Sequence, residues 1–249
     1  MSLRDTALGS SQRGSALGSS QRGTALGSLT WPDTEGYAPA TVLAVPVGAT
    51  EQHGPHLPLS TDTEIALGLA EGLSARRPAV VVAPPVAYGS SGEHCEFAGT
   101  LSIGQEAIEL LLVELGRSAS ATFRRTLLIS THGGNAQPVA RALARLRAEG
   151  RDARAFSPTW SHDTHAGRAE TSLMLALAPA QVRLGVAQAG ATAPLRELLP
   201  RLVAAGVREV SPNGVLGDPA GASADEGASM LARAIDQLVE LVDEWVARA

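Results

Sequence analysis

The segment "GATEQHGPHLPLSTDTE", residues 48–64, groups carboxylate and imidazole side chains between an apolar run and a helical pattern. Glu51, His53, His56 and Asp62 all lie in it, although the chain of 249 residues has only 6 histidines. Ionised carboxylates and neutral imidazoles bind borderline divalent cations, and one carboxylate can bridge two of them. The segment therefore predicts a metal site. Asp62 taken alone could instead be an acid at a helix N-terminus, and His56 could serve merely to orient the loop.

Two later segments carry the same kinds of side chain. "THGGN" contains His132, and "SHDTHAGRAETS" contains His165 and Glu170. Each follows an apolar run that we expect to be a strand, as does the first segment. In open α/β sheets the ligand site lies beyond the carboxyl ends of the strands. The three segments should therefore meet at one edge of the sheet.

Several polar residues of these regions also have plain structural explanations. Glu93 and His94 lie in a glycine-rich loop, where they could contact substrate or anchor the loop. Glu170 could be an acid in the first turn of a helix. His162 and Asp163 could be solvated loop residues, or Asp163 could orient His165. These alternatives stay open at the level of the residues alone.

Apolar runs of strand length alternate with segments of helical periodicity along the chain. Thr61 with Glu64, and Ser223 with Glu226, match capping boxes at the start of the first and last helical segments. Strands that alternate with helices imply a parallel sheet covered on both faces. We therefore expect an α/β fold, a single-domain three-layer αβα with a central, mostly parallel sheet. The patterns predict strands at residues 40–48, 79–86, 126–131 and 153–158, and helices at residues 63–77, 104–120, 136–150 and 223–249.

The chain divides into a repetitive start and one folded domain. A nine-residue unit occurs three times, as "RDTALGSSQ", "RGSALGSSQ" and "RGTALGSLT". Its glycine and serine content cannot bury enough apolar area to offset chain entropy. We expect residues 1–25 to be a flexible extension and residues 26–249 to form the domain, because 44% hydrophobic residues can fill a substantial core.

Charge and cysteine content restrict the partners and the compartment. A formal net charge of -5 argues against a nucleic acid or an anionic membrane, since both usually require a basic face. A small peptide or small amide is the expected substrate. The single Cys95 cannot form an internal disulfide, and no apolar run approaches membrane-spanning length. These features predict a cytoplasmic protein, and bound metals would make Cys95 unnecessary as a nucleophile.

Four motifs resemble those of the creatininase family of metal-dependent amidohydrolases: "PVGATEQHGPHLPLSTDTEIA", "EHCEFAGTLSIG", "THGGNAQPVARAL" and "HAGRAETSLML". The resemblance runs from about Leu26 to the C-terminus. It implies a creatininase-like fold and a homo-oligomer, a closed ring that is commonly a hexamer. The later "SPNGVLGDPAGASADEG" looks most similar to one branch of the family, peptidases that mature a modified ribosomal peptide. The apolar stripe of residues 223–249 would then belong to a covering or interface helix.

The resemblance also implies a ligand set for two divalent metal ions per chain. Asp62 would bridge the ions, with Glu51 and His132 on the first and His53 on the second. The residue types suit zinc, iron or manganese, because all three accept nitrogen and oxygen ligands.

The sequence departs from creatininase itself at two places. Creatininase has a ligand glutamate two residues after the histidine matched by His132, where this chain has Gly134. The resemblance to other members of the family makes Glu170 the natural replacement. His165 matches the catalytic histidine of the family. Trp160 is out of register with a tryptophan that helps to close the creatininase pocket, so creatinine itself is a doubtful substrate.

The expected activity is hydrolysis of a C–N amide bond. Two bound cations would supply hydroxide at neutral pH. A metal ion or the backbone N–H groups of Gly133 and Gly134 would stabilise the oxyanion, with Glu93 and His94 as candidate substrate contacts. His165 would protonate the departing amine. The resemblance to the peptidase branch implies that the reaction releases a C-terminal Val-Tyr dipeptide from the modified peptide. The alternative is a creatinine-type or formamide-type small amide, and the rival from another class is a metal-storing scaffold.

Overall fold

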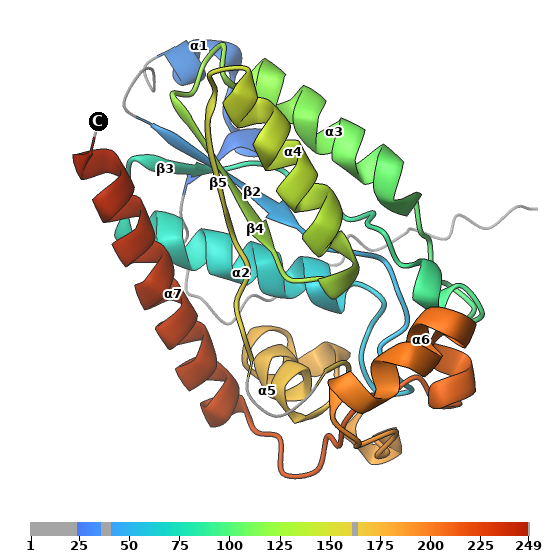
Figure 1. The fold of residues 1–249 in the computed structure, drawn as a ribbon. Coiled ribbons are helices and arrows are strands. Elements are labelled where there is room, and N and C mark those ends of the chain that lie inside the picture. Colours follow the sequence, from blue (N-terminus) through green and yellow to red (C-terminus); the bar gives the residue numbers. More distant parts are fainter. Residues whose placement is uncertain (1–23, 36–40, 161–163, 249) are drawn as a thin grey trace, which may run out of the picture.

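The core of the protein is a sheet of five parallel strands in the order β1-β3-β2-β4-β5 (Figure 1). The computed structural model describes residues 24–35, 41–160 and 164–248. The α/β fold with a parallel central sheet, expected from the sequence, is confirmed. The strands are β1 Thr24–Ala25, β2 Val42–Val47, β3 Val80–Val82, β4 Arg125–Ser130 and β5 Asp152–Phe156.

Seven helices accompany the sheet in the described residues. In Figure 1, α3 and α4 cover one face, whereas α2 and α7 cover the other and α5 and α6 lie beyond the carboxyl ends of the strands. Short 3-10 turns occur in the connecting loops. The helices are α1 Trp31–Glu35, α2 Thr61–Arg76, α3 Gly104–Ala119, α4 Ala136–Ala148, α5 Arg168–Leu177, α6 Leu195–Val210 and α7 Ala224–Ala247, and the turns are η1 Leu26–Ser28, η2 Gly92–His94, η3 Gly133–Asn135, η4 Pro179–Gln181 and η5 Leu184–Val186.

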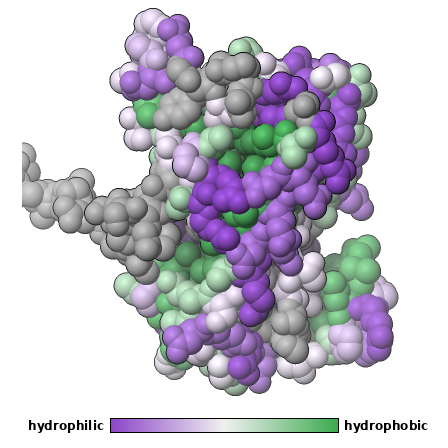
Figure 2. Space-filling model, turned by 90° about the vertical axis from the view of Figure 1, so that its left-hand side faces the viewer, coloured by the Kyte–Doolittle hydropathy of each residue, from purple (hydrophilic) through white to green (hydrophobic). Residues whose placement is uncertain are grey.

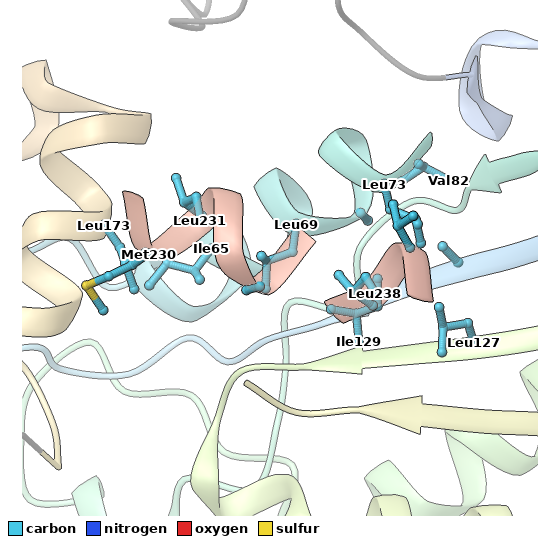
Figure 3. Packing of buried hydrophobic residues seen from close by; sticks show 14 of the residues in the cluster. Ile65, Leu69, Leu73, Val82, Leu127, Ile129, Leu173, Met230, Leu231 and Leu238 are labelled. Atoms are coloured by element: carbon cyan, nitrogen blue, oxygen red, sulfur yellow. The ribbon is translucent and has the colours of Figure 1, made fainter. Parts of the chain in front are cut away.

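Strand β2 is buried along its whole length because both of its faces are covered. Val42 and Ala44 belong to one hydrophobic cluster, whereas Leu43 and Val45 belong to the other. This alternation is the period-two pattern of a strand between two layers. Figure 3 shows the first cluster, in which residues of β4, α2 and α7 come together, among them Leu127, Leu69, Leu73 and Leu238.

The register of the two central strands determines where the polar loops begin. Val42 pairs with Arg125, and Val47 pairs with Ser130. Strands β2 and β4 therefore end side by side, and the loop after β2 begins next to the loop after β4. This places the segments around Glu51 and His132 together, as the rule for parallel sheets predicts.

The helix starts differ in part from the expected capping boxes. At α7 the Ser223 hydroxyl accepts a hydrogen bond from the Glu226 backbone N–H at 3.2 Å. The Glu226 carboxylate turns instead toward Arg168, with 2.9 Å between Nε and Oε2. At α2 the expected Thr61 cap is wrong, because the helix already begins at Thr61, whose hydroxyl donates to the Pro58 carbonyl.

The apolar stripe of α7 packs inside its own chain. Leu238 and Val242 are buried in the first cluster, together with Trp245. Figure 2 turns the side of the molecule that carries α7 toward the viewer and shows hydrophilic residues gathered in a band on this face. The helix is therefore a covering helix, and its stripe is not free to form a contact between subunits.

The N-terminal boundary stays a prediction. Residues 1–23, which hold the first two repeats, lie outside the described residues. Thr24 and Ala25 of the third repeat pair with Val81 and Val82 as the edge strand β1. Across residues 24–35, 41–160 and 164–248, no helix combines the length and apolar content that crossing a membrane requires.

Gly227 allows α7 to approach α5 closely. A Cβ at this position would lie 1.9 Å from the Ser172 carbonyl oxygen. Gly227→Ala should therefore lower the free energy of unfolding by about 1–3 kcal/mol, although alanine favours a helix more than glycine does. Urea denaturation followed by circular dichroism measures this change.

Gly185→Ala is the matched control, because a Cβ there meets nothing within 4 Å. We expect it to change stability by less than about 0.5 kcal/mol. Equal stability of the two variants would show that the contact between α5 and α7 relaxes without cost.

Candidate metal centre

Five potential ligands and one further histidine meet beyond the carboxyl ends of the central strands. Glu51 and His53 come from the loop after β2, and Asp62 from the first turn of α2. His132 follows β4, and Glu170 lies in the first turn of α5. His165, three residues before the start of α5, is also buried here.

Asp62 belongs to two groups of donor atoms at once. Glu51, Asp62 and His132 form one group, and His53, Asp62 and Glu170 form the other, each with atoms within 4.8 Å of one another. The two oxygens of Asp62 face different histidines: Oδ2 lies 3.5 Å from His132 Nδ1, and Oδ1 lies 3.5 Å from His53 Nε2. This is the arrangement that a bridging carboxylate requires.

The remaining distances complete each group. Glu51 Oε1 lies 3.3 Å from His132 Nδ1, and Glu170 Oε2 lies 3.8 Å from His53 Nε2. His165 Nδ1 lies 3.7 Å from Glu51 Oε1. A third group combines Glu51, His53 and His165, so the geometry also permits His165 to act as a ligand.

Unsatisfied polar atoms indicate that the cluster fits cations. Both carboxylate oxygens of Glu51, Nε2 of His53 and Oδ2 of Asp62 are buried without a hydrogen-bond partner among the described residues. Burying a charged group without a partner is costly, and such groups are usually paired or bound to metal. The nitrogen and oxygen donors suit zinc, manganese or iron.

Backbone carbonyls orient the two histidines that face Asp62. His132 Nε2–H donates to the Ser90 carbonyl at 2.7 Å, which leaves Nδ1 free to face the carboxylates. His53 Nδ1–H donates to the Glu51 carbonyl at 3.1 Å, which leaves Nε2 free. These tautomers follow from the hydrogen-bond partners, and such contacts hold a ligand imidazole in place.

Gln52 organises the other two histidines and is a residue that the sequence reasoning missed. Its carbonyl accepts from His165 Nε2–H at 2.8 Å, so His165 Nδ1 faces Glu51. Its side-chain amide donates to His94 Nδ1 and to the Gly214 carbonyl, both at 2.9 Å. Its position between two ligand candidates in "TEQHG" was the available signal.

A cavity of about 850 Å³ opens onto this cluster. Gly134 lies at its edge, where a Cβ would be 2.0 Å from the Ser90 carbonyl oxygen and 2.5 Å from His132 Nε2. No side chain therefore fits at the position where creatininase carries a glutamate. The sequence-predicted residues that line the cavity are Glu51, Glu93, His94, His132, Gly133, Gly134 and His165.

The other candidates from the sequence lie outside the donor groups. His56 hydrogen-bonds Thr171 Oγ1 at 2.9 Å and joins none of the three groups. Trp160 packs against the first hydrophobic cluster, and Cys95 is exposed at the cavity. His162 and Asp163 lie outside the described residues.

The charges of the cluster shift the pKa values of its members. Burial alone would lower the pKa of His53 and of His132, but the carboxylates of Asp62 and Glu51 raise each to about 10. Burial opposes ionisation of Glu51, yet the neighbouring histidines, His132 first, hold its pKa below the usual range. In the absence of metal, the cluster therefore binds protons in place of cations.

His165 and Glu170 behave differently from these residues. Burial, followed by the charge of His53, holds the pKa of His165 well below its usual value, so its imidazole is neutral. Burial raises the pKa of Glu170 to about 7, although His53 acts in the opposite direction. A buried neutral imidazole beside a cation-binding cluster can accept a proton and return it.

Comparison with known proteins agrees with this geometry. The protein family described as creatininase (creatinine amidohydrolase) matches residues 27–242 of this chain. A mycofactocin precursor peptide peptidase of Mycobacterium ulcerans (strain Agy99) is 46% identical over 226 residues, which cover 87% of this chain and 86% of that protein.

Solved creatininase structures share the fold. A tryptophan-to-alanine mutant of creatininase matches with a TM-score of 0.78 at 25% identity, covering 90% of this chain and 99% of that one. Another creatininase mutant, described as a Zn–Zn type, gives a TM-score of 0.76, and a manganese creatininase gives a TM-score of 0.74. Each of the two is 26% identical in sequence, and each match covers 90% of this chain and 98% of the other.

Removing Asp62 should affect metal content more than removing Glu170. Asp62 belongs both to the group with Glu51 and His132 and to the group with His53 and Glu170. If each of these groups binds one ion, Asp62→Asn should reduce the bound ions from two per chain toward zero. Glu170→Gln should lose about one, because Glu170 belongs to one group with Asp62. Metal analysis of the purified variants by mass spectrometry gives the ratio of ions to chains.

Glu93→Gln is the control for this series, because Glu93 lines the cavity but joins no donor group. It should keep both ions. Loss of the same number of ions from Asp62→Asn and Glu170→Gln would contradict a shared aspartate.

Metal affinity should rise with pH. The pKa values of His53 and His132 are raised to about 10 in the metal-free cluster, so both imidazoles are protonated at neutral pH and must release protons to bind a cation. Affinity should therefore increase from about pH 6 to about pH 8. Titration calorimetry in two buffers of different ionisation enthalpy counts the released protons, and a pH-independent affinity with no proton release would refute this account.

Proposed function

The chain belongs to the creatininase family, as its motifs predicted, and we propose that it is a two-metal peptidase with Asp62 shared between the ions. Family membership makes it a metal-dependent amidohydrolase. The observation that supports the two-metal proposal is the pair of donor groups that meet at Asp62, with buried donor atoms left unsatisfied.

The proposed ligand set follows these groups. Glu51 and His132 would hold one ion and His53 and Glu170 the other, with Asp62 on both. Bound there, two such ions would supply hydroxide at neutral pH and would polarise an amide carbonyl. Zinc and manganese are the favoured identities, because solved creatininases are described with each of them, and iron fits the same donors.

The proposed role of His165 is to move the proton. Its Nδ1 faces the Glu51 carboxylate at 3.7 Å, and its Nε2–H is engaged by the Gln52 carbonyl. Nδ1 can therefore accept a proton during attack on the amide and deliver it to the departing amine. The backbone of Gly133 and Gly134, together with Glu93 and His94, borders the cavity where the carbonyl would lie.

The proposed substrate is the mycofactocin precursor peptide in its modified form, with release of the C-terminal Val-Tyr dipeptide. A relative at 46% identity bears the name of that activity. A cavity of about 850 Å³ can hold several residues of a peptide. Gly134 leaves no room for the glutamate of creatininase, which disfavours creatinine itself as the substrate and leaves a formamide-type small amide as the alternative.

Two further expectations accompany this proposal. The resemblance supports a homo-oligomer, although the apolar stripe of α7 is not its interface. A cytoplasmic location is supported by a single, free cysteine in the chain.

The decisive experiment incubates the full chain, loaded with zinc or manganese, with the modified precursor peptide. Mass spectrometry should detect loss of the C-terminal dipeptide, and a chelator should abolish it. Creatinine and formamide are tested in parallel under the same conditions. Hydrolysis of these small amides without peptide cleavage would overturn the substrate proposal, and metal binding without any hydrolysis would favour the metal-storing scaffold.

His165→Ala separates proton transfer from metal binding. If His165 moves the proton, the variant should keep both ions and slow turnover by about 10²–10⁴-fold. Substrate affinity should change little, because the interaction develops mainly in the transition state. Metal analysis and steady-state kinetics on the same preparation test this role, and loss of an ion from His165→Ala would place His165 among the ligands instead.

A further inference from the structure

Helix α6 presents apolar residues in two directions. Leu198 and Val207 are buried and pack with Leu216 in a small hydrophobic cluster. A second stripe, Leu195, Leu199 and Val203, recurs every four residues and is exposed by 43%, 50% and 80%. We call these three residues the outer stripe. Their spacing places them on one side of the helix.

The end of α6 is fixed against the loop that carries Glu93 and His94. Arg208 Nη1 donates to the Glu96 carbonyl at 2.9 Å, and its guanidinium lies 5.1 Å from the centre of the Phe97 ring. Gly206 has a φ of 75°, and a Cβ there would lie 3.1 Å from the Glu93 carbonyl oxygen. These contacts hold α6 beside the metal-centre residues.

The outer stripe lines the same cavity as the candidate metal centre. Leu195, Leu199 and Val203 form part of its wall, and Glu51, His132 and His165 form another part. A molecule that places its amide at the cluster therefore also reaches the stripe.

The charges around the cavity restrict what the stripe can bind. Glu51, Glu93 and Glu96 are acidic, and no lining residue in the described part of the chain is an arginine. The chain contains no lysine. The wall away from the metal centre can therefore select a ligand by apolar contact and offers no side-chain cation for an anionic group.

We propose that the outer stripe of α6 binds an apolar side chain of the substrate residue next to the cleaved bond. This inference rests on the proposed peptidase function and adds the residues that select the substrate. Burial of an aliphatic or aromatic side chain against the stripe removes both apolar surfaces from water. Small or polar residues at that position gain less, so the stripe sets a preference for peptides with a large apolar residue there.

A second copy of the chain is the competing occupant of this surface. The continuity of the stripe with the catalytic cavity favours a substrate side chain, because a subunit seated on Leu199 and Val203 would also cover the route to the cluster. Measuring binding preference and oligomer mass on the same variants distinguishes the two occupants.

The test uses the full metal-loaded chain and fluorescein-labelled hexapeptides that differ at one residue, leucine or alanine. The substitution is placed at the fourth or the fifth position, the two residues that flank the bond whose cleavage releases a C-terminal dipeptide, so that each side of the cleaved bond is examined. Fluorescence anisotropy measures Kd without requiring turnover, and mass spectrometry measures cleavage of the same peptides. A failure of cleavage alone therefore counts against the proposed function, whereas the binding preference decides the present inference.

The wild-type chain should bind the leucine peptide at least about tenfold more tightly than the alanine peptide at one of the two positions. In Leu199→Ala and Val203→Ala this ratio should fall toward one. Leu110→Ala is the matched control, because Leu110 is 54% exposed on α3 and does not line the cavity; it should keep the ratio.

Two results would overturn the inference. The first is the absence of any leucine preference in the wild-type chain, whether or not it cleaves the peptides. The second is an unchanged ratio of the two Kd values in Leu199→Ala and Val203→Ala. If the light-scattering mass of these variants also falls, the outer stripe forms a contact between subunits instead.

Discussion

The site depends on two buried carboxylates, Glu51 and Asp62, that lie too close together to remain without a counter-charge. In the described part of the protein, no hydrogen bond satisfies the Glu51 oxygens or one oxygen of Asp62. Four imidazoles surround them, and protons on His53 and His132 supply the missing charge in the metal-free state. Divalent cations would satisfy the same atoms more directly, because a charge of two can meet several donors at once. The surrounding loops serve to hold this concentration of charge.

The parallel sheet brings these carboxylates and imidazoles together. Strands β2 and β4 end in register, so two loops that are distant in sequence begin side by side. The first turn of α2 then returns toward the same edge and contributes Asp62. The hydrophobic layers on both faces of the sheet hold the starts of these loops and of α2 in fixed positions.

The sequence predicted the parts that depend on local pattern. The strands around Val45 and Leu128 were predicted because continuous apolar runs mark strands buried on both faces. The way in which these elements pack against one another was harder to predict from the sequence. Nothing in the periodicity of residues 223–249 distinguishes a stripe that packs within the chain from one that packs on another subunit. Gln52 was missed because its importance lies in hydrogen bonds to His94, His165 and Gly214, which only the folded chain brings together.

The position of Glu170 couples metal binding to the packing of the C-terminal helix. Glu170 lies on α5, and α5 is held by α7 through the close approach of Gly227 to Ser172 and the ion pair between Arg168 and Glu226. A cation bound by Glu170 therefore stabilises the arrangement in which α7 is seated. By thermodynamic linkage, ligation and the closure of the C-terminal helix reinforce each other. Metal-free protein should consequently open first at its C-terminal end, far along the chain from the "TEQHG" loop that contains Glu51 and His53.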